Sequence, residues 1–419
     1  MVRDNLPKDN LNNHRKTSLD QSFILGINYW PRESAMYWWK KFDQTLVKRD
    51  FSMLAEYNFK LIRIFLLWED FQPEMKSVPA KSLLSLVKVA DIAYDLKIKI
   101  LPTFFCGHMS GLNWVPYWMV ASGREEGKYP LFSMGSVRKG KIRNMYIDGE
   151  VQKAQKLFIH ETINALQGHK GIWGWDLGNE PSNLVLPPTK DAAKGWLEEM
   201  VTELKRYDDD LPITLGLHQE DLENNNLLTP KEVADYCEIL SMHAYPVYAD
   251  WSDGPLDEKF TLFLLKLTQL LGGKEVILEE FGLPTDPYPL KLSAEEKDKL
   301  GSIKLIAEND AEIYLEKTLK LLPKWGINGA LVWCFADYDP GLWEKPPLNE
   351  RVHERFFGLF RWDGQPKGGA KIFQQMAMEK SPGQVNNEWF DIKPEEFYEQ
   401  PGKHIKRLYQ RFKKYLETN

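Results

Sequence analysis

Short apolar runs alternate along most of the chain with longer stretches in which apolar residues recur every three or four positions. Runs of the first kind are typical of buried parallel strands, and stretches of the second kind are typical of amphipathic helices. The pattern predicts eight strands, at residues 23–30, 60–68, 98–105, 171–179, 212–218, 239–245, 275–281 and 327–335. It predicts helices at residues 46–57, 82–96, 151–166, 196–207, 260–271, 311–322 and 369–378.

Strand–helix alternation that is repeated eight times predicts an α/β fold, a single (β/α)8 TIM barrel over residues 23–380. Two of the connecting loops are long, at residues 106–149 and 336–368, after the third and eighth strands. Because barrel enzymes carry their active sites at the carboxyl ends of the strands, we expect these loops to form walls of a binding pocket.

Two segments lie outside the predicted barrel. Residues 1–22 are a polar extension without the apolar core of a signal peptide, so we expect a cytoplasmic protein. Residues 381–419 are expected to form a strap and then a basic amphipathic helix at 403–416. Its apolar face would carry Ile405, Leu408, Tyr409, Phe412, Tyr415 and Leu416. We expect this helix to dock on the acidic barrel, and binding to a membrane surface is the alternative.

Composition excludes several classes of partner. A formal net charge of -6 provides no electrostatic basis for nucleic-acid binding, and no apolar run is long enough to span a membrane. The cysteines at 106, 237 and 334 lie in or beside apolar runs without metal-site spacing, which predicts reduced core thiols. Fifteen tryptophans, many of them in polar loops, suit the flat C–H faces of pyranose rings. No sequence feature sets the oligomeric state.

Carboxylates close two of the predicted strands. The strand at 171–179 ends in Asn179-Glu180-Pro181, where the proline stops the hydrogen-bond ladder, and the strand at 275–281 contains Glu279 and Glu280. In a barrel both strand ends open on one pocket. A carboxylate pair there meets the needs of glycoside hydrolysis, with one group as acid and one as nucleophile. Strand alternation puts Glu279 and Glu280 on opposite faces without saying which face is inward.

These two motifs resemble the acid/base and nucleophile motifs of the retaining glycoside hydrolases of clan A, and most closely those of glycoside hydrolase family 5. In that family the acid/base glutamate follows an asparagine that contacts the sugar 2-hydroxyl, and the nucleophile precedes an aromatic residue and a glycine. The resemblance covers residues 23 to about 380. It implies that Glu180 is the acid/base, Glu280 the nucleophile and Asn179 the substrate contact, while Glu279 takes no part in the chemistry.

Other positions complete the predicted site. Arg63 lies inside an apolar strand, where an unpaired guanidinium would be costly, so a carboxylate partner is expected. The family places such an arginine beside the nucleophile. His243 and Tyr245 resemble the family's His-x-Tyr on strand six, whose tyrosine donates to the nucleophile. Positions that resemble further sugar-binding residues of the family are His108, Trp114 and Trp333.

The expected reaction is hydrolysis of a β-linked oligosaccharide with retained configuration. Glu280 would attack the anomeric carbon while Glu180, kept protonated by its anionic neighbour, donates to the leaving oxygen. No cofactor or metal is expected, since the His160-Glu161 pair lacks the second histidine of a zinc HExxH helix and no glycine-rich phosphate loop is present.

The overall likeness to mannanases and mannosidases favours β-mannosides as substrates, followed by β-glucosides and β-galactosides. Exo attack is expected because the long loops bring Trp114, Trp118 and Trp343 to where they could close one end of the groove. A catalytically inactive sugar-binding barrel is one alternative, but it would have no need of paired carboxylates. A metal- or phosphate-dependent barrel enzyme is another, but it would need a Schiff-base lysine in a strand or a cluster of metal ligands.

Overall fold

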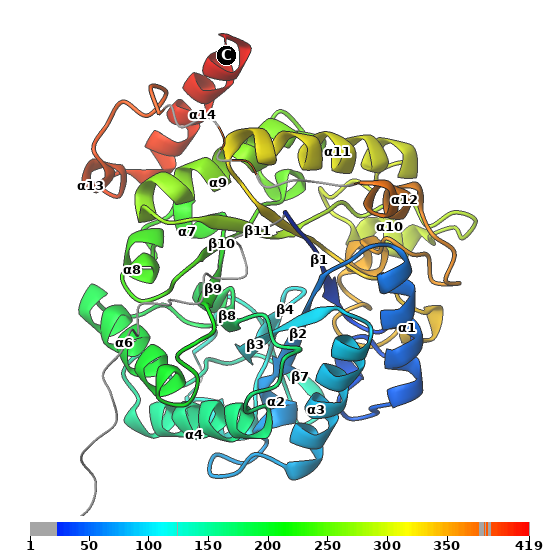
Figure 1. Ribbon diagram of the computed structural model, residues 1–419, viewed down its shortest axis with the longest axis vertical. Helices are drawn as coiled ribbons and strands as arrows, with labels where there is room; N and C mark the ends of the chain where they lie inside the picture. The colour runs from blue at the N-terminus through cyan, green and yellow to red at the C-terminus, as the bar shows by residue number, and fades with distance from the viewer. Residues whose placement is uncertain (1–22, 124, 377–380, 382, 384–386, 419) are drawn as a thin grey trace, which may run out of the picture.

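The computed structural model describes residues 23–123, 125–376, 381, 383 and 387–418. Eight parallel strands close into a barrel in which each strand pairs with its neighbours in sequence and the last pairs with the first (Figure 1). They are β1 (Ile24–Tyr29), β2 (Leu61–Leu67), β3 (Lys99–Cys106), β8 (Trp175–Asn179), β9 (Ile213–His218), β10 (Leu240–His243), β11 (Val276–Phe281) and β12 (Gly329–Val332). The predicted (β/α)8 barrel is confirmed. The expected extension at 1–22 lies outside the described residues.

Helices surround the barrel (Figure 1). They are α1 (Gln44–Glu56), α3 (Ala80–Asp95), α4 (Gly149–Ala165), α6 (Lys190–Tyr207), α8 (Pro230–Ala234), α9 (Glu258–Gly272), α11 (Glu308–Leu321) and α12 (Gly368–Gln375). Asp43, Asp148 and Asp257 start three of them by accepting hydrogen bonds from backbone N–H groups of the first turn. The sequence pattern missed α8, because five residues carry too little periodicity to be recognised.

The barrel interior is layered. A separate apolar cluster fills it near the amino ends of the strands, formed by Ile24, Leu61, Leu101, Trp173, Ile239, Ile277 and Leu331. Arg63 lies two residues beyond Leu61 on β2 and therefore shares its inward face. Arg63, Asp176 and Glu279 are all fully buried, so a charged layer lies above the apolar one. The pocket described below lies over this charged layer.

The long loop after β3 contains a small sheet of its own. Its strands are β4 (His108–Met109), β5 (Leu112–Trp114), β6 (Leu131–Ser133) and β7 (Ser136–Arg138), joined in that order. Strands of two or three residues leave no readable alternation in the sequence, which is why this segment was predicted only as a loop. The sheet anchors the first part of the loop, including His108, beside the barrel mouth.

The C-terminal helix α14 (Pro401–Thr418) docks on the outside of the barrel against α9 and α7 (Glu220–Glu223) (Figure 1). Its buried side chains are Ile405, Leu408, Tyr409, Phe412 and Tyr415. The Tyr409 hydroxyl donates to Asp257 Oδ2 at 2.5 Å, and the Lys413 ammonium pairs with Asp253. Over the part of the chain that the structure describes, no helix combines the length and the apolarity needed to cross a membrane.

Replacing Phe412 with alanine tests whether α14 unfolds together with the barrel. Phe412 is fully buried among Phe263, Trp325 and Trp389. Phe412→Ala is expected to lower the free energy of unfolding by about 3–5 kcal/mol, measured by urea denaturation. Lys406→Ala, at an exposed position of the same helix, is the control. An unchanged urea midpoint for Phe412→Ala would mean that α14 detaches before the barrel unfolds.

Candidate active site

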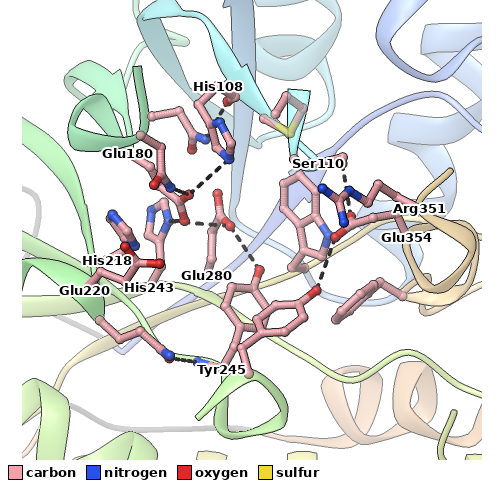
Figure 2. Close-up of a pocket in the computed structure, with 18 of the residues that line it drawn as sticks. His108, Ser110, Glu180, His218, Glu220, His243, Tyr245, Glu280, Arg351 and Glu354 are labelled. Atoms are coloured by element: carbon pink, nitrogen blue, oxygen red, sulfur yellow. Dashed lines mark hydrogen bonds and ion pairs between the residues drawn. The ribbon is translucent and has the colours of Figure 1, made fainter. Parts of the chain in front are cut away.

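A cavity of about 360 Å³ opens at the carboxyl ends of the barrel strands. This volume is within the range typical of small-molecule sites. The wall draws on the ends of β8, β9, β10 and β11 and on the loops after β3 and β12 (Figure 2). The predicted site residues that line it are His108, Asn179, Glu180, His243, Tyr245, Glu280 and Trp333. Seven of the predicted residues therefore lie together at one cavity.

Glu180 follows β8 and directly precedes a short helix that begins with Pro181. Its backbone is left-handed, with φ 47° and ψ 56°, a strained conformation for a residue with a side chain. Such strain is typically found at functional sites. The Glu180 carboxylate accepts hydrogen bonds from His243 Nδ1 at 2.9 Å and from Asn183 Nδ2 at 2.8 Å. His108 Nε2 lies 3.9 Å from the same carboxylate.

Glu280 lies in β11, with its carboxylate at the floor of the pocket. Arg63 Nη1 donates to one of its oxygens at 2.6 Å, and the Tyr245 hydroxyl donates to the other at 2.9 Å. Two donors on two different oxygens fix the plane of the carboxylate. One oxygen of Glu280, one oxygen of Glu180 and a ring nitrogen of His243 all lie within 4.8 Å of one another.

Glu279 and Glu280 are consecutive, yet both carboxylates reach the guanidinium of Arg63. Glu279 Oε2 is 3.5 Å from Arg63 Nη2 and 3.2 Å from His243 Nε2. The cause is an irregularity in β11, whose register against β12 shifts between Leu278 and Phe281. A bulge of this kind breaks the inward–outward alternation. Glu279, which the resemblance leaves out of the chemistry, thus lies beside Arg63 and His243 and not on the outward face that regular alternation would give it.

Arg63 holds three carboxylates and is fully buried. Besides Glu280 and Glu279, its Nη2 donates to Asp176 Oδ2 at 2.7 Å. Gly216 on β9 makes room for this group, because a Cβ there would lie 3.0 Å from Arg63 Nη2 and 2.8 Å from a backbone oxygen. The carboxylate partner expected for Arg63 is thus present, and three different carboxylates share this role.

The pKa of Glu180 is shifted in the direction opposite to that expected of a protonated acid. Burial raises the pKa of Glu180, but His218, His243 and His108 outweigh it and hold that pKa below its ordinary value. Burial raises the pKa of Glu280, against the lowering by His243 and Arg63. The expectation that Glu180 is kept protonated by its anionic neighbour is therefore wrong for this geometry.

His243 is the group that carries the proton instead. Burial lowers its pKa, but the charge of Glu280 and the hydrogen bonds to Glu180 and Glu279 raise it to about 10. The imidazole is therefore protonated at neutral pH. Both ring nitrogens face carboxylate oxygens, one at 2.9 Å and one at 3.2 Å.

Asn179, His108 and Trp333 border the pocket, and contacts within the protein hold their side chains. The Asn179 side chain accepts from Arg63 and donates to the backbone oxygen of His108, both at 3.0 Å. His108 Nδ1 lies 2.7 Å from Asn113 Oδ1, which leaves Nε2 facing the cavity and Glu180. The Trp333 ring is set by an edge contact with Phe65.

Trp114 does not contact the pocket, so its prediction as a sugar contact is corrected. Its ring is 2% exposed and packs against Tyr37 and Phe132. Trp118 and Trp343, expected to close the groove, are also outside the lining. Each donates its indole N–H to a backbone oxygen instead, that of Gln72 and that of Tyr338 respectively. All three tryptophans therefore pack within the loops and away from the cavity.

Polar residues that the sequence argument did not single out complete the wall. They are Ser110, His218, Gln219, Glu220, Arg351, His353 and Glu354. His218 ends a predicted strand, so the rule that found Glu180 could have found it as well. Ser110 and Glu354 are 244 positions apart, and no sequence pattern reports that their loops meet.

Glu180, His243 and Glu280 are also, among the residues that the structure describes, the group whose donor atoms converge as metal ligands would. The hydrogen bonds of His243 argue for another use of this convergence. A protonated imidazole that donates to two carboxylates has no lone pair for an ion. The arrangement suits proton transfer between the ring and Glu180.

Comparisons with solved structures agree with the barrel fold. No protein-family model and no curated protein sequence matches the chain. Among solved structures, a GH5_18 protein from Streptomyces cattleya in complex with GlcNAc is similar, with a TM-score of 0.70 and 20% identity. The match covers 85% of this chain and 79% of that one.

Two further structures are similar over a comparable share of this chain. A variant of a GH5_18 protein from Bifidobacterium longum in complex with Manβ1-4GlcNAc has a TM-score of 0.69 and 18% identity, over 86% of this chain and 80% of that one. Exo-β-1,4-mannosidase Op5Man5 from an Opitutaceae bacterium has a TM-score of 0.68 and 21% identity, over 87% of this chain and 61% of that one. At these identities the comparisons establish the shared fold.

Removing the Glu280 carboxylate tests its assignment as the nucleophile. Glu280→Ala is expected to lower kcat by roughly 10⁴ or more, because the covalent step loses its attacking group. Tyr245→Phe, which removes only one donor to Glu280, is expected to lower kcat far less. Equal losses in the two variants, measured on the same aryl glycoside, would contradict this assignment.

Replacing Arg63 with methionine tests the electrostatic link to Glu280. The positive charge lowers the pKa of Glu280, so its loss should raise that pKa and move the acidic limb of the pH–rate profile to higher pH. Stability should also fall by about 3–5 kcal/mol, because buried carboxylates lose their partner. An acidic limb that stays in place would show that another group controls the ionisation of Glu280.

Proposed function

We propose that this protein is a retaining β-glycoside hydrolase. The observation that carries the proposal is the separation of its two pocket carboxylates, whose nearest oxygens lie within 4.8 Å. Retaining enzymes hold their carboxyl groups about 5 to 5.5 Å apart, whereas inverting enzymes leave about 6.5 to 9.5 Å for a water molecule. The approach of Glu180 and Glu280 to within this distance favours the retaining mechanism.

Each catalytic group has the neighbours that its role requires. Glu280, oriented by Arg63 and Tyr245, attacks the anomeric carbon as the bond to the leaving oxygen breaks. The proton for that oxygen comes from Glu180, which is hydrogen-bonded to His243. A water molecule then returns a proton to Glu180 and cleaves the glycosyl–Glu280 ester. The configuration is retained.

β-Mannosides are the proposed substrates. The support is the bound Manβ1-4GlcNAc in one similar structure and the exo-β-1,4-mannosidase activity named for another. β-Glucosides and β-galactosides are the alternatives within the same mechanism. An inactive sugar-binding barrel is disfavoured, because a binding protein gains nothing from a strained glutamate beside a buried arginine.

Exo attack is proposed because three loops join over one side of the pocket. Ser110, from the loop after β3, donates to Glu354 Oε2 at 3.0 Å, and Tyr248, after β10, donates to Glu354 Oε1 at 3.2 Å. The Arg351 side chain packs on Gly111, where a Cβ would lie only 2.7 Å from Nε. In Figure 2 this cluster lies on the side of Glu280 away from Glu180.

The position of these joined loops indicates which end of the substrate they block. Glu180 protonates the leaving group, so the leaving group lies on the Glu180 side of the pocket. The Ser110–Glu354 contact then lies beyond the sugar that Glu280 attacks, where further units of a long chain would continue. Ser110 and Glu354 therefore have the closing role that was expected of Trp114, Trp118 and Trp343.

Substrate class is tested by comparing aryl β-mannoside, β-glucoside, β-galactoside and β-xyloside side by side. The highest kcat/KM is expected for the β-mannoside, and proton NMR should show the β-anomer as the first product. A first-formed α-anomer would contradict the retaining mechanism. Faster hydrolysis of another aryl glycoside would replace the proposed sugar without changing the mechanism.

The mode of attack is tested by the products from mannohexaose over time. Monosaccharide should appear first, because the joined loops admit only a chain end. Glu354→Ala should weaken this enclosure and lower kcat/KM by about ten- to hundredfold, the size expected for hydrogen bonds to a charged group. Early mixtures of di-, tri- and tetrasaccharide from the unmodified enzyme would contradict exo attack.

A further inference from the structure

One buried carboxylate of the pocket floor has no part in the mechanism described so far. Glu279 is fully buried and contacts no part of the cavity. Its Oε2 lies 3.2 Å from His243 Nε2, and His243 Nδ1 lies 2.9 Å from Glu180 Oε1. A carboxylate, an imidazole and the acid/base carboxylate thus form one continuous hydrogen-bonded line.

Both ends of this line are held in place. Arg63 lies 3.5 Å from Glu279, and Asn183 donates to the second oxygen of Glu180 at 2.8 Å. Charged and titratable groups from the neighbouring strands surround His243. They are Glu279 and Glu280 on β11, Asp176 on β8, Glu180 just after β8, His218 on β9, Arg63 on β2 and Tyr245 beyond β10. Negative groups predominate among them.

The charge balance shows where a proton must stay. Arg63 and a protonated His243 carry two positive charges against four carboxylates, those of the buried Asp176, Glu279 and Glu280 and of the partly exposed Glu180. Loss of the imidazole proton would leave one cation for four anions in a region of low dielectric, which is strongly unfavourable. Glu279 contributes directly, because it faces the imidazole nitrogen on the side away from the substrate.

We propose that Glu279 is a positioning residue that holds a proton on the His243–Glu180 pair and so keeps the catalytic acid protonated. This role rests on the proposed function and deepens it. Glu279 touches no substrate, and it acts through the imidazole. The pair, and not the Glu180 carboxyl alone, is then the acid of the first step.

The proton balance of the cycle follows from this assignment. In the first step the proton held between Nδ1 and Oε1 passes through Glu180 to the leaving oxygen as the glycosidic bond breaks and the Glu280 ester forms. In the second step water gives a proton back to the pair, and its oxygen bonds to the anomeric carbon as the ester breaks. The pair ends each turnover with the proton it started with.

A purely structural role for Glu279, as one more partner of Arg63, makes a different prediction. If the role were only structural, replacing Glu279 would lower the free energy of unfolding or kcat. The pKa of the His243–Glu180 pair would then stay the same. Asp176 provides the matched control, because it is equally buried and is bonded to the same guanidinium, while its hydrogen-bond partners are Arg63, Thr103 and backbone N–H groups.

The first test follows the His243 ring by nitrogen NMR in protein labelled at its eight histidines. His243→Gln identifies the signal by its loss. In the unmodified protein the ring should stay protonated above pH 8, and in Glu279→Gln it should lose its proton at a pH lower by about one unit or more. Asp176→Asn should move it less. Titration of the unmodified ring near pH 6.5 would overturn the proposal, even if Glu279→Gln did not fold.

The second test uses the pH dependence of kcat/KM. Removing the negative charge of Glu279 weakens proton binding by the pair, so Glu279→Gln should move the alkaline limb to lower pH by about one unit or more. An alkaline limb that stays in place or moves to higher pH would overturn the proposal. The NMR test needs no substrate, so failure of the proposed hydrolase activity and failure of this role can be told apart.

Discussion

A guanidinium without exposed surface holds the floor of this pocket together. Arg63 contacts the carboxylates of Asp176, Glu279 and Glu280 at 2.7, 3.5 and 2.6 Å. Three carboxylates could not share so small a buried volume without a cation between them, because each would be desolvated and would repel the other two. The position of the proposed nucleophile depends on this one side chain.

The difference between the two catalytic carboxylates comes from their neighbours. Glu280 is held by one permanent cation and one phenol, which leave it fixed and aimed at the cavity. Glu180 is held by an imidazole and an amide, and the imidazole can share a proton with the carboxylate. A group that must give and take a proton in each turnover thus lies beside groups that can share one.

The sequence predicted the barrel because strands and helices leave patterns of different period, and it found Glu180 and Glu280 because each ends a strand. It did not find the role of Glu279, because the strand irregularity that turns this side chain inward changes no residue type. Trp114 was misjudged for a related reason. A tryptophan in a polar loop can face a sugar or support the loop, and only its packing against Phe132 decides.

Contacts between loops were equally hidden. Ser110 and Glu354 come together only because the barrel closes and brings two distant strand ends to one mouth. The histidines around Glu180 come from β9, from β10 and from the loop after β3, and only the three-dimensional structure shows that they surround one carboxylate. These long-range contacts hold the pKa of Glu180 below its ordinary value, which the sequence did not suggest.

The most direct measurement of the central claim is to trap the covalent intermediate. A 2-deoxy-2-fluoro-β-mannosyl fluoride forms the glycosyl–enzyme ester and then hydrolyses slowly, so the label can be located by peptide mass spectrometry. The account predicts one sugar per protein, attached to Glu280 in the peptide that also contains Glu279. A label on Glu180 or Glu279, or turnover with inversion and no label, would contradict the account.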